Sequence, residues 1–168
     1  MLHLEKAGNG FYCPEDPGEP GLGEKRWSTD LGEARIVSEL LKGLEVLEIG
    51  TGLGVSTKII AEKAYWVHTV DIDQWVKDNI ACDLPRNTSF YTDIAKVPMM
   101  IEGAFVDGLH TYEQCLIDIA NAKFHVQKGG LLIFHDANMP AIHQAVVDSG
   151  LVCYYIKTPA GIAFGWKD

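Results

Sequence analysis

The sequence predicts a doubly wound α/β domain with a mostly parallel, seven-stranded sheet and an antiparallel hairpin at its C-terminal edge. Short apolar segments alternate with amphipathic segments from residue 28 onward, which is typical of strands joined by helices. The apolar segments contain few polar residues, as expected of parallel strands that are buried on both faces. The last two apolar segments flank Thr158-Pro159-Ala160-Gly161, a turn sequence typical of a hairpin.

Helical periodicity and capping residues predict the helices. Asp30 with Glu33 forms a capping box ahead of the first one. Thr111 with Gln114 forms a second capping box, ahead of a helix that we expect to end at Gly129-Gly130. The spacing predicts that the buried face of this helix is made by Leu116, Ile117, Ala120 and Phe124. The other helices are expected at residues 56–64, 73–81 and 140–150.

Seven apolar segments predict the strands, which cover residues 45–49, 66–70, 89–91, 103–106, 131–134, 152–156 and 162–166. Carboxylates follow four of them, at Asp71, Asp93, Asp107 and Asp136. Ligands of open parallel sheets bind at the carboxyl ends of the strands. We therefore expect the functional site at this edge.

Composition narrows the classes of partner. The chain has 168 residues and a formal net charge of −9, which disfavours nucleic acid and anionic membranes as partners. Residues 1–27 are rich in glycine, proline and charge and are predicted to form an irregular arm, followed by a single domain at residues 28–168. No signal peptide or Cys-x-x-Cys pair is present, so we expect free thiols and a cytoplasmic location. The composition is compatible with a homo-oligomer and does not determine the oligomeric state.

A glycine-rich turn, Gly50-Thr51-Gly52-Leu53-Gly54, joins the first strand to a helix. Asp71 follows about 20 residues later, where an acid binds the ribose hydroxyls of a nucleoside cofactor. Val55 stands where a dinucleotide site needs glycine. Glu48, just before the turn, would repel a pyrophosphate and attract an ammonium group. These residues argue against a dinucleotide-dependent oxidoreductase and favour S-adenosylmethionine.

Two neighbouring strands bring further titratable residues to the same edge. Asp107 and His110 follow one strand, and His135 and Asp136 end the next. We expect Asp107, His110 and Asp136 to converge beside the methyl-donor position. Two carboxylates and two imidazoles suit a divalent cation with oxygen ligands and a histidine base.

The segment Val46–Gly54 resembles the first motif of class I S-adenosylmethionine-dependent methyltransferases, and Val70-Asp71-Ile72-Asp73 resembles their second. The resemblance covers roughly residues 30–168 and implies their Rossmann-like fold. It implies that the glycine turn holds the methionine part, Asp71 the ribose and Asp93 the adenine amino group. The residues expected to bind the cofactor are Glu48, Gly50, Thr51, Gly52, Gly54, Asp71, Ile72, Asp93 and Asp107.

The segments 105–113 and 130–136 are similar to the small-molecule O-methyltransferases of the macrocin O-methyltransferase type and their cephalosporin-biosynthesis relatives. The resemblance implies Mg²⁺ on Asp107 and Asp136, with His135 as a third ligand and His110 as the base. His135 replaces an acid, and Ala137 stands where catechol-type methyltransferases have an asparagine ligand. Two alternatives therefore stay open, a divalent cation softer than Mg²⁺ or no metal.

The predicted activity is transfer of a methyl group from S-adenosylmethionine to a hydroxyl of a small molecule. The alternative is a non-catalytic protein that binds S-adenosylmethionine or another nucleoside on the same fold, because a fold does not determine a function. The chain lacks an obvious insertion to cover the acceptor, so only the first 30 residues or a partner subunit could close the site.

Overall fold

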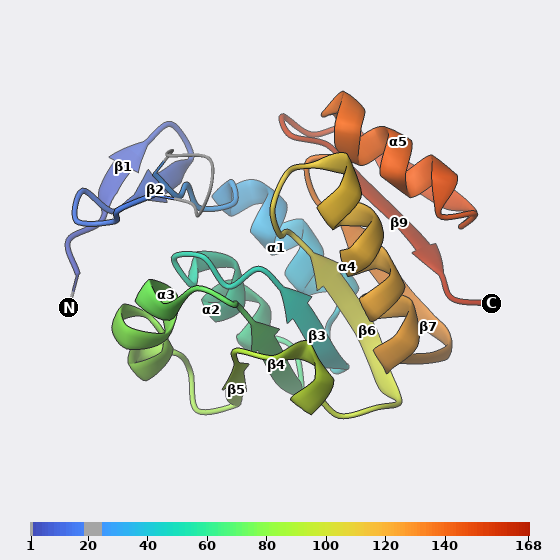
Figure 1. Cartoon of the computed structure of the whole chain (residues 1–168), viewed down its shortest axis with the longest axis horizontal. Coiled ribbons are helices and arrows are strands. Elements are labelled where there is room, and N and C mark those ends of the chain that lie inside the picture. The colour runs from blue at the N-terminus through green and yellow to red at the C-terminus, as the bar shows by residue number, and fades with distance from the viewer. Residues whose placement is uncertain (1, 19–24) are drawn as a thin grey trace.

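The computed structural model describes residues 2–18 and 25–168. Seven strands form one sheet in the order β5-β4-β3-β6-β7-β9-β8 (Figure 1). The strands are β3 (Glu45–Ile49), β4 (Trp66–Val70), β5 (Thr88–Tyr91), β6 (Ile101–Val106), β7 (Val126–Phe134), β8 (Cys153–Ile156) and β9 (Ile162–Trp166). The five neighbouring strands β5, β4, β3, β6 and β7 are parallel, and β9 is antiparallel to both β7 and β8. The predicted fold class is confirmed, including the edge hairpin.

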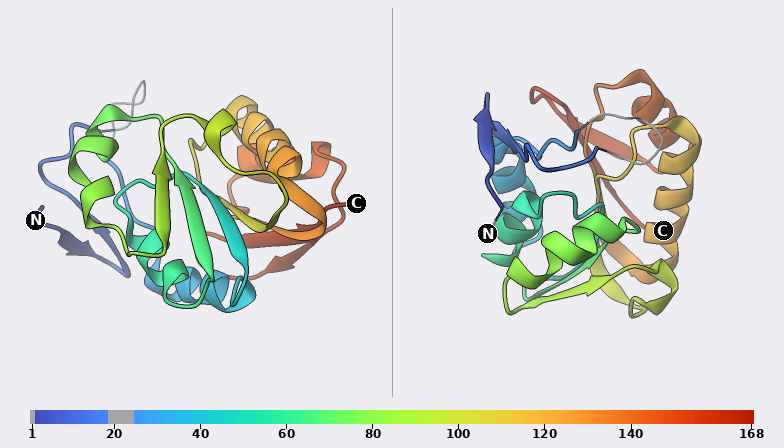
Figure 2. Two further views of the ribbon diagram at one scale, coloured as in Figure 1. Left: turned by 90° about the horizontal axis from the view of Figure 1, so that it is seen from below. Right: turned by 60° about the vertical axis from the view of Figure 1, so that its left-hand side comes forward.

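Helices cover both faces of the sheet (Figures 1 and 2). One face packs against α1 (Leu31–Leu40) and α2 (Val55–Ala61). The other packs against α4 (Tyr112–His125) and α5 (Pro140–Asp148). The shorter helices are α3 (Gln74–Asn79), η1 (Ala81–Asp83) and η2 (Ile94–Lys96). In residues 2–18 and 25–168, no helix has the length and apolar character needed to cross a membrane.

The central strands bury side chains on both faces because successive residues of a strand point in opposite directions. In β3, Val46 packs on the α1–α2 side and Leu47 on the α4–α5 side. In β6, Phe105 and Ala104 repeat this arrangement. The two-sided burial explains why these strands are continuously apolar in the sequence.

The buried face of α4 differs from the prediction. Cys115, Ile119 and Ala122 face the core, whereas Ile117 and Phe124 are 53% and 65% exposed. Successive residues turn a helix by 100°, so two apolar stripes can lie side by side. Leu116, which belongs to the predicted face, packs against the core in part, so the buried face is rotated relative to the prediction.

The C-terminal boundary of α4 also differs. β7 begins at Val126, directly after the helix, so Gly129-Gly130 lies inside the strand instead of ending the helix. A Cβ on Gly130 would lie 2.7 Å from the carbonyl oxygen of Glu102. Glycine therefore serves a close approach of two backbones at this position.

The N-terminal segment contains regular structure, so the prediction of a wholly irregular arm is wrong. Strands β1 (Glu5–Ala7) and β2 (Gly10–Tyr12) form an antiparallel hairpin that projects from the body of the domain (Figure 2). Gly8, at φ +61°, and the following residue form its two-residue turn. Ser28 ties the hairpin to the domain, since its hydroxyl accepts the Phe11 N–H at 2.6 Å.

Candidate functional site

The carboxyl ends of the parallel strands meet at one edge of the sheet. Gly50 N–H donates to the Val70 carbonyl, and Asp107 N–H to the Ile49 carbonyl, both at 2.9 Å. A cleft of about 430 Å³ opens at this edge, between the glycine turn, the ends of the strands, α4 and residues 26–29. Pockets for small molecules usually measure about 300–1,000 Å³. The cleft is therefore large enough for a small-molecule ligand.

The turn after β3 needs glycine for two different reasons. Gly50 has a φ of +97°, and a Cβ there would lie 2.0 Å from the carbonyl oxygen of Asp107. Gly54, at φ +71°, is the N-cap of α2. Thr51 is buried, and its hydroxyl oxygen lies 2.6 Å from that of Thr69. The turn thus lets a ligand approach the backbone closely.

Asp71 follows β4 and lines the cleft beside this turn. Its Oδ2 accepts the Gly52 N–H at 3.0 Å, and its Oδ1 accepts the Asp73 N–H at 2.9 Å. Burial raises the pKa of Asp71, and the Gly52 hydrogen bond and the charge of Arg26 oppose that rise. Each carboxylate oxygen has capacity for a further hydrogen bond, so Asp71 can accept two neighbouring hydroxyls.

Ile72 and Asp93 lie at the same cleft. Ile72 is 83% exposed and offers the cleft an apolar surface. Asp93 caps η2, since its Oδ1 accepts the Ala95 N–H at 3.0 Å. Every residue predicted to bind the cofactor lines the cleft except Glu48 and Gly54.

Glu48 is fully buried and does not reach the cleft. Its carboxylate accepts the hydroxyls of Ser56 at 2.7 Å, Thr57 at 2.5 Å and Thr69 at 2.6 Å. Burial raises the pKa of Glu48 to about 7, although the three hydroxyls oppose the rise. The expected direct contact with an ammonium group is therefore wrong, because these side chains enclose the carboxylate.

The side chains of Asp107, His110 and Asp136 converge, as predicted. One potential ligand atom from each residue lies within 4.8 Å of the others. Nε2 of His110 lies 2.9 Å from Oδ2 of Asp136 and 3.7 Å from Oδ1 of Asp107. The register of β6 and β7 causes this convergence, because Val106 pairs with Phe134 at the ends of the two strands.

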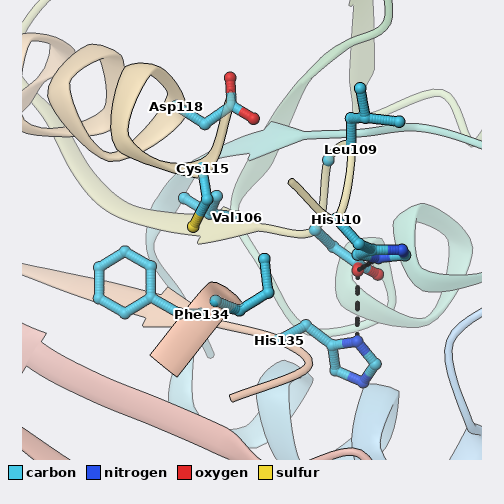
Figure 3. Close-up of a pocket in the computed structure, with 10 residues that line it drawn as sticks. Val106, Leu109, His110, Cys115, Asp118, Phe134 and His135 are labelled. Carbon is cyan, nitrogen blue, oxygen red and sulfur yellow. Dashed lines mark ion pairs between the residues drawn. The ribbon is translucent and has the colours of Figure 1, made fainter. Parts of the chain in front are cut away.

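His135 is not part of this ligand group, because carboxylates surround both of its ring nitrogens. Nε2 lies 2.9 Å from Glu33, while Nδ1 lies 3.0 Å from Asp136 and 3.2 Å from Asp107. The dashed line in Figure 3 marks the ion pair between His135 and Asp107. Burial alone would lower the pKa of His135, but the three carboxylates raise it to about 12. Both ring nitrogens therefore already have carboxylate partners, and the ligand atoms that converge among the described residues belong to Asp107, His110 and Asp136. The assignment of His135 as a metal ligand is wrong.

Glu33 is a site residue that sequence reasoning missed. It is 1% exposed, and its second oxygen accepts the Ala160 N–H at 2.8 Å. Glu33 therefore links α1 to His135 and to the turn between β8 and β9. The sequence did offer a signal, because Glu33 lies on the same helical face as Ala34 and Val37, which are buried. The capping-box pattern had already given Glu33 a structural role, so a role in the site was not considered.

The two carboxylates beside His110 favour its protonated form, which cannot act as a base. Its contacts with Asp107 and Asp136 raise the pKa of His110 to about 10. A histidine with this pKa holds its proton at neutral pH and has no lone pair with which to accept another. His110 could act as a base only where its neutral form is restored.

The same three residues fit a divalent cation. Nε2 of His110 is buried and has no aligned hydrogen-bond partner among the described residues. Two carboxylates and an imidazole nitrogen form a donor set that divalent cations accept. A bound cation would satisfy the unpartnered nitrogen and favour the neutral form of His110.

The segment before α1 also contributes to the site, which the prediction of an irregular arm did not include. The Thr29 hydroxyl donates to Oδ2 of Asp107 at 2.6 Å. Arg26 is buried and forms ion pairs with Asp16 and Asp73. These contacts hold residues 26–29 along one wall of the cleft.

Comparison with known proteins gives a family and a fold. Residues 47–137, more than half of the chain, match the family described as "Methyltransferase domain". The chain is 31% identical over 71 residues to a probable ribosomal RNA small subunit methyltransferase A of Pyrobaculum islandicum. This match covers 39% of the chain and only 30% of that relative.

Solved structures share the fold at low sequence identity. Cofactor-bound Rv0187 from MTB has a TM-score of 0.71 and 15% identity, with 89% of this chain and 84% of that chain covered. The O-methyltransferase TomG from Streptomyces achromogenes, in complex with SAM, has a TM-score of 0.67 and 13% identity, with 83% and 81% covered. At these identities the similarity extends to the fold alone.

Proposed function

The chain belongs to the methyltransferase domain family, and on this premise we propose that it transfers the methyl group of S-adenosylmethionine to a hydroxyl of a small molecule. The observation that carries the proposal is the pairing of the glycine turn with Asp71. Gly52 donates to the Asp71 carboxylate at 3.0 Å beside the cleft. This arrangement suits a nucleoside whose ribose meets the acid while the rest of the molecule follows the turn.

The residues at the other end of the cleft define where the acceptor binds. Asp107 and His110 line the cleft. Asp136 lies beside the His110 ring, and His135 contacts both Asp107 and Asp136. Holding the acceptor hydroxyl in line with the sulfonium methyl supplies much of the rate. The oxygen attacks the methyl carbon while the carbon–sulfur bond breaks, the hydroxyl proton passes to water in the cleft, and S-adenosylhomocysteine leaves.

Asp107, His110 and Asp136 would hold a divalent cation at this position. Such a cation supplies positive charge that lowers the pKa of a hydroxyl and orients it. The chain's own residues keep the cluster in place, since Thr29 binds Asp107 and the imidazolium of His135 lies between Asp107 and Asp136. These features support an enzyme of the macrocin O-methyltransferase type over a non-catalytic nucleoside-binding protein.

The charge of the cleft favours a small acceptor without phosphate groups. Five aspartates line it, namely Asp71, Asp73, Asp93, Asp107 and Asp118. Among the described residues, Arg26 is the only arginine or lysine that lines the cleft, and its charge is already paired with Asp16 and Asp73. An RNA acceptor, the substrate class in the name of the Pyrobaculum relative, would meet carboxylates at the site of transfer, where an RNA backbone needs basic residues.

Calorimetric titration with S-adenosylhomocysteine and with NAD tests the cofactor assignment. S-adenosylhomocysteine should bind and NAD should not. Asp71→Asn keeps one accepting oxygen but loses charge-assisted hydrogen bonds to the ribose, so affinity should fall roughly tenfold or more. Asp78→Asn, at an exposed position of α3, is the matched control and should bind as the wild type does. Binding of NAD alone would refute the proposal.

Turnover tests the catalytic part of the proposal. Release of S-adenosylhomocysteine is measured with a panel of hydroxyl-bearing small molecules, with added Mg²⁺ and with a chelator. His110→Ala should abolish turnover and leave the affinity for S-adenosylhomocysteine unchanged, since His110 is placed on the acceptor side. Turnover that is unchanged in His110→Ala would remove His110 from the mechanism.

A further inference from the structure

The C-terminal edge of the sheet is an apolar surface that has no part in the candidate functional site. β8 is the last strand of the sheet, and among the described residues it pairs with β9 alone. Four large apolar side chains of this edge are exposed, namely Val152, Tyr154, Tyr155 and Trp166. Figure 1 shows β9 at the end of the molecule that carries the C-terminus. An exposed apolar surface of this kind often marks a site of protein association.

Aromatic side chains stand on both faces of this edge. Tyr154 stacks on Phe164 with ring centroids 5.7 Å apart, and Trp166 meets the two rings edge-on at 6.0 Å and 5.7 Å. Phe164 packs against the core on the α1–α2 side of the sheet, so these three rings form a platform on that face. Tyr155 points to the opposite face, where its ring lies 5.4 Å from that of His143. Tyrosine and tryptophan are enriched in interfaces between proteins.

The β8 strand lacks charged residues and proline, which usually prevent an edge strand from pairing with another chain. Its residues, Cys153–Ile156, include neither, and its register with β9 is regular. The strand at the opposite edge, β5, differs, because none of its residues is exposed and Pro85 and Arg86 precede it. Of the two edges of this sheet, the β8 edge is therefore the one suited to receive a further strand.

The distribution of charge favours a second copy of this chain as the partner. The chain carries 23 aspartates and glutamates and a net charge of −9, so most of its surface repels another copy. Residues 137–167 contain only three charged residues, namely Asp148, Lys157 and Lys167. Two copies can therefore approach each other through this part of the chain without opposing like charges.

Two-fold symmetry makes the β8 edge complementary to itself. An isologous pair of edge strands runs antiparallel, so the end of one β8 lies beside the start of the other. Lys157 is exposed and directly follows β8, and the exposed Asp148 ends α5 shortly before β8 begins. Pairing of two copies therefore brings Lys157 of each toward Asp148 of the other, at both ends of the paired strands.

We propose that two copies of this chain form a symmetric dimer through antiparallel pairing of their β8 strands, with the Tyr154 side chains packed at its centre. Main-chain hydrogen bonds between the two strands would join the two sheets into one continuous sheet. β8 has only four residues, so its aromatic side chains supply much of the affinity. The proposal concerns assembly and is independent of the methyl donor.

Sedimentation velocity over a wide range of protein concentration tests the dimer. The wild type should sediment with twice the mass of the chain at high concentration. Tyr154→Lys places a charge at the centre of the interface and should weaken the dimer roughly a hundredfold or more. Tyr65→Lys, at an exposed position before β4, is the matched control and should dimerise as the wild type does. Thermal unfolding verifies that both variants fold.

Hydrogen exchange tests the pairing of the strands. The amides of Cys153–Ile156 should exchange more slowly at high protein concentration, because the dimer protects those that its paired strands bond. The amides of β5, at the opposite edge of the sheet, are the internal control and should exchange at a rate independent of concentration. Protection that appears at β5 and not at β8 would overturn the proposal.

Charge reversal tests the antiparallel arrangement. Lys157→Asp should weaken the dimer about threefold to thirtyfold, because it then meets Asp148 of the second copy. Adding Asp148→Lys to the same chain should restore the dimer. A combined variant no tighter than Lys157→Asp alone would overturn the arrangement. A wild type that stays monomeric at every concentration would overturn the dimer and leave the edge to a different protein, and a dimer that Tyr154→Lys leaves intact would equally refute the proposed interface.

Discussion

Replacing Glu48 with glutamine should change how the stability of the domain depends on pH. The carboxylate is fully buried and accepts three hydroxyls, from Ser56, Thr57 and Thr69. Burial raises its pKa from 4.5 to about 7. Over the pH range between these two values, the folded chain keeps a proton that the unfolded chain has lost. Glutamine has similar shape and no charge to titrate, so the variant lacks this dependence.

The magnitude follows from the difference between the two pKa values. A carboxyl whose pKa is higher in the folded state stabilises that state below pH 4.5, and this contribution is lost as the pH rises through 7. At about 1.4 kcal/mol per pKa unit, the difference between 4.5 and about 7 amounts to about 3 kcal/mol in total. Most of this contribution is lost between about pH 5 and pH 8.

Urea unfolding at pH 5, 6, 7 and 8 measures the effect through the extrapolated free energy of unfolding. The wild type should lose about 2–3 kcal/mol relative to Glu48→Gln across this range. Glu113→Gln, at an exposed position of α4, is the matched control and should follow the wild type. A difference between wild type and Glu48→Gln that is independent of pH would refute the raised pKa. A difference that grows in favour of the wild type with rising pH would show that the sign is wrong.

Two further substitutions test how the cleft is built. Gly50→Ala adds a methyl group 2.0 Å from the Asp107 carbonyl oxygen, whereas Gly43→Ala, at φ +78°, has no atom within 4 Å of the added group. Both variants should lose about 1 kcal/mol of unfolding free energy to backbone strain. Only Gly50→Ala should also bind S-adenosylhomocysteine more weakly, as measured by calorimetry. Equal binding by both variants would contradict the close contact. Arg26→Met removes the ion pairs with Asp16 and Asp73 and leaves a buried charge unpaired, so denaturant unfolding should show a loss of about 3 kcal/mol. An unchanged stability would mean that the segment before α1 is not held by these pairs.

Much of the cofactor end of the site could be predicted from the sequence. The glycine turn and Asp71 are close in the chain, and strand–turn–helix geometry determines how they lie. The spacing of Gly50 and Gly52 after a strand therefore sufficed to place them at the cleft. The convergence of Asp107, His110 and Asp136 followed from one further assumption, that their two strands are neighbours, and the sheet order confirms it.

The roles of individual titratable groups could not be predicted in the same way. Glu48 and His135 have the right residue types at the right ends of strands, yet Glu48 is enclosed by hydroxyls and His135 is bonded to Glu33. Glu33 is separated from His135 by 102 residues. The charge of a buried group depends on such distant partners, because burial removes the water that would otherwise stabilise it.

From residue 28 onward, the fold class, the order of the main strands and helices, and the edge of the sheet at which the cleft forms could all be inferred from the sequence. These features depend on local propensity, on periodicity and on the rule that ligands bind where parallel strands end. The buried face of α4 depends on how the helix packs in the folded chain, where Asp118 turns inward while Ile117 and Phe124 stay exposed. Helical periodicity allowed two neighbouring apolar stripes on α4, and the packing of Cys115, Ile119 and Ala122 in the core shows which one faces the sheet.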